Sequence, residues 1–166
     1  MAGKLLMDGG KYVIFNVVGS PIEGRHTGKG NPNAILHVGR PLNRRQQALL
    51  DKLPCFDSRI TVRKGDVSMN DLAALTAVTG DEFAMFTMGA RRLVIRGDDW
   101  HVNINDKTAA LMNAQGYRWS GHTHPKLYDG LEFIASEEDV KVLKRFDQDE
   151  SAIYNAKGQH HTFTKD

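Results

Sequence analysis

Short runs of β-branched and aromatic residues alternate along the chain with segments that are expected to be helical. The clearest strand-like runs cover residues 59–63, 82–88, 91–96, 117–124, 151–155 and 159–163. Gly89-Ala90 separates one pair of runs and Ala156-Lys157-Gly158 separates another, which favours two antiparallel hairpins. This alternation predicts an α/β (α+β) fold in which helices flank a mixed sheet.

Four segments are expected to form helices. Ser68-Met-Asn-Asp71 has the form of a capping box, so the sequence predicts a helix that begins after Ser68 and ends before Gly80. The other three helices are expected at residues 41–53, 107–115 and 136–146. Further strands are predicted at residues 12–18, 34–38 and 100–104.

The length and composition fit one globular unit with an N-terminal appendage. The chain has 166 residues, of which 40% are hydrophobic and 25% are charged, and this is enough to bury one core. We therefore divide it into an N-terminal extension or linker with strands and one helix, residues 1–66, and a domain at residues 67–166.

Charge and cysteine content argue against several classes of protein. The net charge is only +2, and the basic residues are spread among the acidic ones, so no nucleic-acid or membrane partner is expected. Cys55 is the only cysteine, which excludes a disulfide framework, and its apolar neighbours predict a buried thiol. No membrane span or secretory signal is seen, so the chain is expected to be cytoplasmic or a domain of a larger secreted or phage-encoded protein.

His122-Thr-His124 places two imidazoles two residues apart in an expected strand. Side chains alternate along a strand, so both rings project from one face, at a spacing that suits one metal ion. Catalytic zinc sites use three protein ligands, and Asp139 is the best candidate for the third. Ser136-x-x-Asp139 is also a helix-capping pattern that needs no metal, and a histidine pair can serve other roles.

Together these residues resemble the signature of the JAB/MPN (JAMM) zinc metalloprotease family. The resemblance rests on Trp119-Ser-Gly-His122-Thr-His124-Pro125, followed downstream by Ser136-x-x-Asp139. Upstream, Glu82 opens a strand-like run that ends at Gly89, as a glutamate does in that family. The resemblance covers roughly residues 67–163, and Met85 stands where many members of the family have glycine.

The resemblance implies a site and a reaction. His122, His124 and Asp139 would be ligands of Zn²⁺, and Glu82 would be the general base that takes a proton from zinc-bound water, the nucleophile. The Ser136 hydroxyl would stabilise the oxyanion. The chain would thus be a zinc-dependent hydrolase of peptide or isopeptide bonds, built on a mixed, curved sheet with the layering of cytidine deaminases.

The sequence around this signature resembles JAB domains attached to bacterial polymorphic toxins and phage proteins. It implies a peptide or protein substrate, with a ubiquitin-like tail and a peptidoglycan peptide as alternatives. Two other classes stay open. One is a non-catalytic MPN-like interaction or scaffold module, and the other is a metal-dependent nuclease, which no clustered basic stripe supports.

The remaining aromatic residues and histidines near these motifs are given no catalytic role. Trp119 and Phe133 flank the expected site. We expect them to be core residues, as we do Trp100 and Tyr128, with a place in the lining of a substrate groove as the alternative. The histidines outside the signature are expected to be structural or exposed, and they are His26, His37, His101, His160 and His161.

Overall fold

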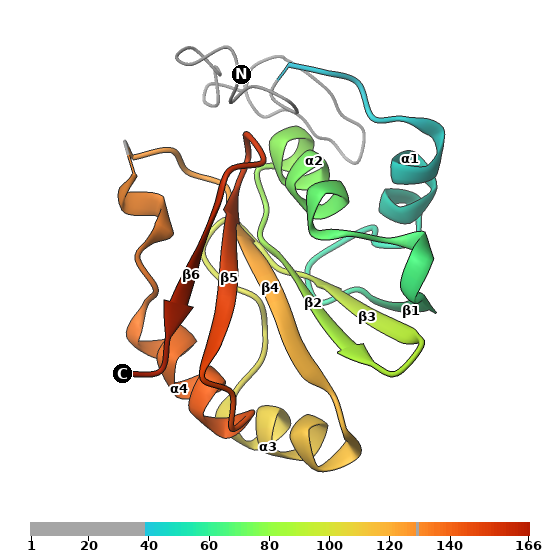
Figure 1. The fold of residues 1–166 in the computed structure, drawn as a ribbon. Coiled ribbons are helices and arrows are strands. Elements are labelled where there is room, and N and C mark those ends of the chain that lie inside the picture. Colours follow the sequence, from blue (N-terminus) through green and yellow to red (C-terminus); the bar gives the residue numbers. More distant parts are fainter. Residues whose placement is uncertain (1–38, 129) are drawn as a thin grey trace.

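A computed structural model describes residues 39–128 and 130–166, and the strands predicted at residues 12–18 and 34–38 lie outside them. Figure 1 shows how the helices and strands are arranged. In chain order they are α1 (Arg44–Asp51), β1 (Arg59–Arg63), η3 (Lys64–Asp66), α2 (Met69–Thr79), β2 (Phe83–Met88), β3 (Arg91–Arg96), α3 (Asp106–Gln115), β4 (Arg118–His124), η4 (Leu131–Phe133), α4 (Glu137–Arg145), β5 (Glu150–Asn155) and β6 (His160–Thr164). Within the described residues, no helix is both long and apolar enough to cross a membrane.

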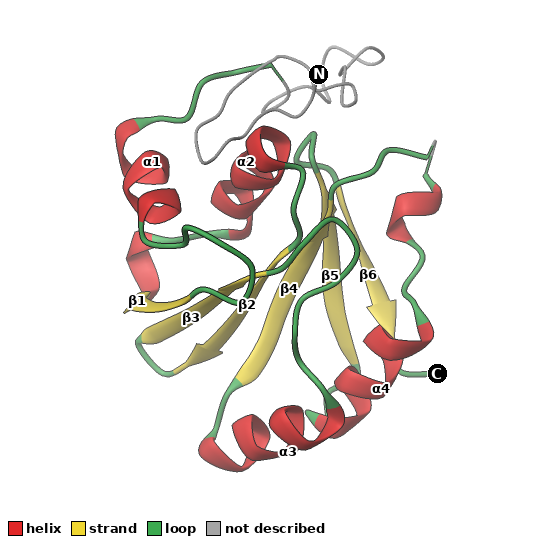
Figure 2. Cartoon of the chain, turned by 180° about the vertical axis from the view of Figure 1, so that it is seen from behind, coloured by secondary structure: helices red, strands yellow, loops and turns green. Residues whose placement is uncertain are grey.

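The six strands of the described residues form one mixed sheet in the order β1-β3-β2-β4-β5-β6. β4 and β5 are parallel, and all other neighbours in the sheet are antiparallel. Helices α1 and α2 lie on one face of this sheet, and α3 and α4 lie on the other (Figures 1 and 2). The predicted mixed α/β fold with flanking helices is confirmed, and so are the two predicted hairpins, β2–β3 and β5–β6.

Alternation along β2 divides the core into two layers. Phe83 and Met85 pack with the apolar side of α2, whereas Ala84 and Phe86 pack with α3 and α4. Both sets are at most 2% exposed, so β2 is covered on both faces. Met85, the residue that departs from the JAMM pattern, therefore lies on the sheet face opposite Ala84.

Local capping explains where two of the helices begin. In α2 the Ser68 side chain accepts a hydrogen bond from the backbone N–H of Asp71, and the Asp71 carboxylate accepts one from the backbone N–H of Ser68. The predicted capping box is confirmed, and α2 ends at Thr79, with Gly80 as its C-cap at a φ of +77°. Helix α1 begins at Arg44 and not at Pro41, because Asn43 is its N-cap.

The strand predicted at residues 100–104 does not form. The Asp98 side chain accepts hydrogen bonds from the backbone N–H groups of Trp100, at 2.8 Å, and His101, at 2.9 Å. These bonds turn the backbone sharply after β3, so it does not continue into another strand. The connection from β3 to α3 instead crosses the face of the sheet, over β4 and β5 (Figure 2).

The prediction of a buried thiol at Cys55 is also wrong, because this residue is exposed. Leu53 is fully buried and is the last residue of this segment that contributes to the core. Beyond it, the Ser58 hydroxyl accepts a hydrogen bond from the backbone N–H of Cys55 at 3.0 Å, which turns the chain outward. Of the apolar neighbours of Cys55, Leu53 therefore ends a buried segment, whereas Phe56 lies in an exposed turn.

Residues 44–63 belong to the same sheet and core as the residues that follow them. β1 pairs along its whole length with β3. Leu49 and Leu50 of α1 are each 6% exposed and pack in one cluster with Leu72 of α2. The division of the chain at residue 66 stays a prediction, and the helix predicted within the N-terminal segment is present as α1.

Candidate metal centre

β4 carries both histidines of the motif on the face that packs against α3 and α4. His122 pairs with Ala84 of β2 on one side and with Ile153 of β5 on the other, and both partners belong to the core under α3 and α4. His124 lies two residues further along β4 and therefore projects from the same face. The Nε2 atoms of the two rings are 3.0 Å apart, so both imidazoles face one point.

Asp139 reaches the same point from the first turn of α4. Ser136 is the N-cap of this helix, and its Oγ accepts a hydrogen bond from the backbone N–H of Asp139 at 3.1 Å. Asp139 Oδ2 accepts a bond from the backbone N–H of Ser136 at 2.9 Å. The same Oδ2 lies 3.4 Å from His122 Nε2 and 3.7 Å from His124 Nε2. One side-chain conformation thus caps the helix and faces the histidines.

These three atoms have the spacing that a zinc ion requires. Tetrahedral coordination with bonds of about 2.0–2.1 Å sets ligand atoms about 3.3 Å apart. The observed separations are 3.0, 3.4 and 3.7 Å. Burial lowers the pKa of His122, which disfavours a positively charged ring next to the Asp139 carboxylate. A bound cation would balance that carboxylate, so the residues present fit a metal ion.

Different contacts orient the two imidazole rings. His124 Nδ1–H donates a hydrogen bond to the backbone carbonyl of Glu132 at 2.5 Å, which leaves the lone pair of the neutral ring on Nε2. His122 is 2% exposed, and its ring stacks on Trp119 with the centroids 4.9 Å apart. Its Nδ1 has no hydrogen-bond partner among the described residues. The ring of His122 is therefore held by packing and that of His124 by a hydrogen bond.

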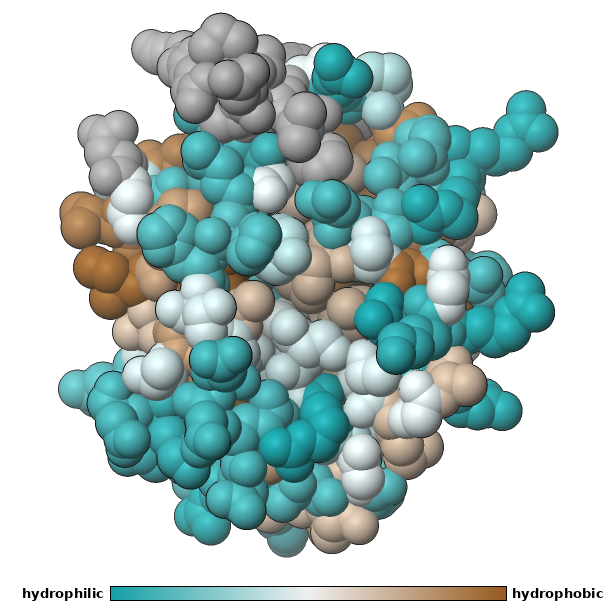
Figure 3. Space-filling model, in the orientation of Figure 1, coloured by the Kyte–Doolittle hydropathy of each residue, from teal (hydrophilic) through white to brown (hydrophobic). Residues whose placement is uncertain are grey.

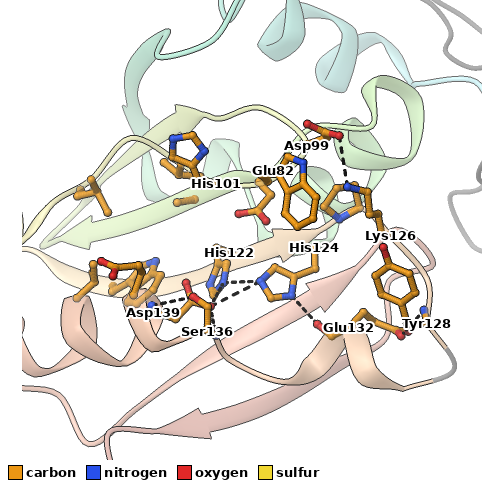
Figure 4. A pocket seen from close by; sticks show the side chains of 18 of the residues that line it. Glu82, Asp99, His101, His122, His124, Lys126, Tyr128, Glu132, Ser136 and Asp139 are labelled. Atoms are coloured by element: carbon orange, nitrogen blue, oxygen red, sulfur yellow. Dashed lines mark hydrogen bonds and ion pairs between the residues drawn. The ribbon is translucent and has the colours of Figure 1, made fainter.

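Glu82 is the second acidic group that faces this point. It directly precedes β2. In the antiparallel pair β2–β4, Ala84 lies opposite His122. Extending this register by two residues sets Glu82 opposite His124. Two backbone hydrogen bonds of 2.7 Å to residues 97–98 hold it in place. Figure 4 shows its carboxylate pointing into the cavity on the side of the two histidines.

The two acids differ in their ionisation. Burial raises the pKa of Glu82 to about 10, and the negative charge of Asp139 adds to this shift. Burial also acts to raise the pKa of Asp139, but the electrostatic interaction with His122 and the hydrogen bonds from both imidazole rings and from the Ser136 backbone N–H outweigh it and hold that pKa well below its usual value. Asp139 is therefore ionised. A divalent cation at the three ligand atoms would offset the repulsion between the two acids and lower the pKa of Glu82.

The five residues of the predicted site line one cavity of about 390 Å³. Two loops form its walls, the connection from β3 to α3 and the connection from β4 to α4 (Figure 4). The residues of these walls are Asp99, Trp100, His101, Val102 and Ile104 from the first loop and Pro125, Lys126, Tyr128, Leu131 and Glu132 from the second. The cavity is in the size range of ligand-binding pockets.

Two aromatic residues of the walls are not in the core, contrary to prediction. Trp100 is 73% exposed and Tyr128 is 52% exposed, whereas Trp119 is a core residue as predicted. The Lys126 ammonium lies 3.8 Å from the centre of the Trp100 ring and 3.4 Å from an Asp99 carboxylate oxygen. Lys126 thereby connects the two loops beside the cavity.

Apolar side chains are also exposed on the side of the cavity formed by η4. Leu131, which lines the cavity, and Ile134 are each 64% exposed. Figure 3 shows hydrophobic residues, in brown, gathered at the edge of the molecule where η4 lies. Exposed apolar surface beside a cavity with a few polar groups is typical of a binding site.

Glu132 is the residue of the site that the sequence motifs did not indicate. It is 7% exposed, and its backbone carbonyl orients His124. A backbone carbonyl has no signature in the sequence, because every residue has one. The available signal was an acidic residue within the apolar run Leu131-Glu132-Phe133-Ile134.

The other histidines that the structure describes take no part in this group. His101 is an exposed residue of the cavity wall, and its Nδ1 lies 3.1 Å from an Asp98 carboxylate oxygen. His160 and His161 are exposed on β6 and stack on Tyr154 and Phe133, respectively. The predictions for His26 and His37 lie outside the described residues.

No known protein family, curated protein or solved structure matches this chain. The site therefore has to be interpreted from its own geometry. That geometry is a group of two histidines and one aspartate on a mixed α/β scaffold, with a buried glutamate in the same cavity.

Proposed function

We propose that this chain is a zinc-dependent hydrolase of the JAB/MPN (JAMM) type that cleaves a peptide or isopeptide bond. One observation carries the proposal. His122 Nε2, His124 Nε2 and Asp139 Oδ2 lie within 3.7 Å of one another in a cavity that also contains Glu82 and Ser136. The order of these residues in the chain resembles the JAMM signature, which supports the same reaction.

Each residue has a role that follows from its position. A bound zinc ion would act as a Lewis acid and lower the pKa of water toward about 7. Glu82 takes the proton of the attacking water while the oxygen of that water bonds to the amide carbon. Glu82 then passes the proton to the amine nitrogen as the carbon–nitrogen bond breaks. His122, His124 and Asp139 hold the metal.

Ser136 is placed to stabilise the negative charge that develops on the substrate oxygen. Its Oγ accepts the hydrogen bond from the Asp139 backbone N–H, which leaves the hydroxyl proton for a second partner. A hydroxyl that donates to the developing oxyanion lowers the barrier to the reaction. Capping of α4 holds this hydroxyl in position before the substrate binds.

The charges of the cavity favour a peptide over a nucleic acid. A polyanionic backbone binds where lysine and arginine side chains neutralise its phosphates. Among the described residues, five acidic residues and one lysine line this cavity, and they are Glu82, Asp99, Glu132, Glu138, Asp139 and Lys126. The exposed aromatic and aliphatic side chains of its walls offer contacts to a peptide instead.

The metal is tested by measuring the zinc content of the purified protein. We expect close to one zinc per chain, which is lost in the variant His122→Ala/His124→Ala. The matched control is His160→Ala/His161→Ala, which also removes two imidazoles, and it keeps its zinc. A wild-type protein that binds no zinc contradicts the proposal and favours a scaffold module.

The reaction is tested with Glu82→Gln, which removes the base but none of the three ligands. We expect this variant to bind zinc as the wild type does and to cleave a library of quenched fluorescent peptides and lysine-linked isopeptides about 10²–10⁴-fold more slowly. If Glu82→Gln cleaves these substrates as fast as the wild type does, Glu82 is not the general base. DNA cleavage that this substitution abolishes, without peptide cleavage by the wild type, points to a nuclease.

A further inference from the structure

Glu132 is a buried carboxylate that forms no ion pair within the described part of the chain. It is 7% exposed, so its charge has to be compensated by hydrogen bonds. Oε1 accepts bonds from the backbone N–H groups of Tyr128 and Gly130, both at 2.9 Å, and Oε2 accepts one from Asn155 Nδ2 at 3.1 Å. The carboxylate thereby fixes the loop that follows β4.

Asn155 connects Glu132 to the sheet. It is fully buried at the end of β5, and its Oδ1 accepts bonds from the backbone N–H groups of Lys157, at 3.0 Å, and Gln159, at 2.9 Å. Its Nδ2 also donates to the side chain of Gln159 at 2.9 Å. The amide therefore has a partner for each donor and acceptor, and the turn between β5 and β6 sets its position.

His124 closes this network. In the parallel pair β4–β5, His124 lies directly opposite Asn155. Glu132 contacts both residues. Its carboxylate accepts a hydrogen bond from Asn155, and its backbone carbonyl accepts one from His124 Nδ1–H. The ring orientation of one candidate ligand thus depends on a contact between two side chains outside the ligand set.

We infer that Glu132 and Asn155 are positioning residues that hold His124 in its metal-binding orientation. The inference rests on the proposed metal site, because it names the residues that orient one of its ligands. Partners behind a metal ligand typically change metal affinity by about 10–100-fold when they are removed. Disrupting the contact between Glu132 and Asn155 therefore lowers zinc affinity by about this factor.

Reversing the polarity of the contact tests the inference. Glu132→Gln sets one amide NH₂ against another, and Asn155→Asp sets two buried carboxylates against each other. In the double variant Glu132→Gln/Asn155→Asp a donor again meets an acceptor, with its direction reversed. At position 132 the oxygen of the introduced amide can still accept from Tyr128 and Gly130, and at position 155 the introduced carboxylate can still accept from the turn.

Zinc affinity is measured by competition with a chromogenic chelator, and the visible absorption of the Co²⁺-substituted protein reports the coordination geometry. We expect each single variant to lose about 10–100-fold in zinc affinity with an altered Co²⁺ spectrum, and the double variant to recover most of both. Glu150 is an exposed carboxylate on β5, and Glu150→Gln is the matched control. We expect its zinc affinity and its Co²⁺ spectrum to equal those of the wild type. Thermal unfolding of the metal-free proteins separates loss of fold from loss of ligand orientation.

Two results overturn the inference. One is wild-type zinc affinity and an unchanged Co²⁺ spectrum in both single variants, and the other is a double variant no better than the single ones. A wild-type protein that binds no zinc contradicts the proposed function itself. A wild type that binds zinc and cleaves peptides, with no effect of the reversal, contradicts only the roles of Glu132 and Asn155.

Discussion

Asp139 both caps α4 and faces the two histidines, and one substitution separates these roles. In Asp139→Asn the amide oxygen still accepts from the Ser136 backbone N–H, so the cap is kept, but the anionic ligand is lost. We expect zinc affinity to fall by more than about 100-fold, since a direct ligand counts for more than a residue behind it. The free energy of unfolding of the metal-free protein changes by less than about 1 kcal/mol. Chelator competition and urea unfolding measure the two effects.

The matched control is Asp71→Asn, which changes the same capping pattern at the start of α2. We expect this variant to bind zinc with wild-type affinity, and an equal loss of zinc in both variants would contradict a ligand role for Asp139. The pair also shows what the sequence could not decide. Ser68-x-x-Asp71 and Ser136-x-x-Asp139 are the same local pattern, and only the packing of α4 beside β4 brings one of them to the histidines.

The connection from β3 to α3 is the element in which local sequence was misleading. Its apolar residues predicted a strand at residues 100–104, but they face the cavity from a loop. These residues form a loop because the backbone turns at Asp98 and because the backbone of His101 lies against Gly97. A Cβ atom at Gly97 would lie 2.1 Å from the carbonyl oxygen of His101, which leaves no space for a side chain.

Gly97→Ala therefore forces the backbone of this loop to move. We expect the free energy of unfolding to fall by about 2–4 kcal/mol, because the atoms in the way are backbone and cannot rotate aside. Urea denaturation measures this loss. Gly65→Ala is the control, since a Cβ at Gly65 meets no atom within 4 Å, and its effect is expected to stay below about 1 kcal/mol. Equal stability of the two variants would show that the loop adapts without cost.

Helices α1 and α2 are joined by an ion pair whose contribution depends on pH. Arg45 donates two hydrogen bonds, of 2.6 and 2.9 Å, to the buried carboxylate of Asp71. Burial acts to raise the pKa of Asp71, but the bonds from Arg45, Gln46 and Ser68 outweigh it and lower that pKa. A lowered pKa in the folded state gives stability that is present above the unfolded pKa of about 3.9 and is lost as the pH falls through the folded value.

Asp71→Asn removes this dependence on pH. With Arg45 half exposed, we expect the substitution to cost about 1–2 kcal/mol in metal-free protein at pH 7. The difference from the wild type should shrink as the pH is lowered below about 4. Urea denaturation of both proteins across this range tests the sign, and a difference that grows toward acid pH would contradict it.

At the scale of the whole molecule, pairings between sequence neighbours could be predicted and distant ones could not. The hairpins β2–β3 and β5–β6 follow from short turns that contain glycine. The insertion of β4 between β2 and β5 has no local signal, because it depends on how the two apolar layers pack. Glu82 and His122 are brought together by this insertion. The motif predicted that Glu82 and His122 share a site, but how these two residues lie relative to each other depends on the fold.

A metal ion at this junction would join β4 to α4, so its removal should lower the stability of the whole fold. At a free zinc concentration about 1,000 times the Kd, binding stabilises the folded state by about 4 kcal/mol, which for a chain of this size raises the Tm by roughly 10 °C. We expect a chelator to abolish this rise in the Tm of the wild type. We expect zinc to leave the Tm of His122→Ala/His124→Ala unchanged. Glu82→Gln should keep the full rise, because a base is not a ligand. If this variant loses the rise, Glu82 binds the metal itself, and another group must take the proton.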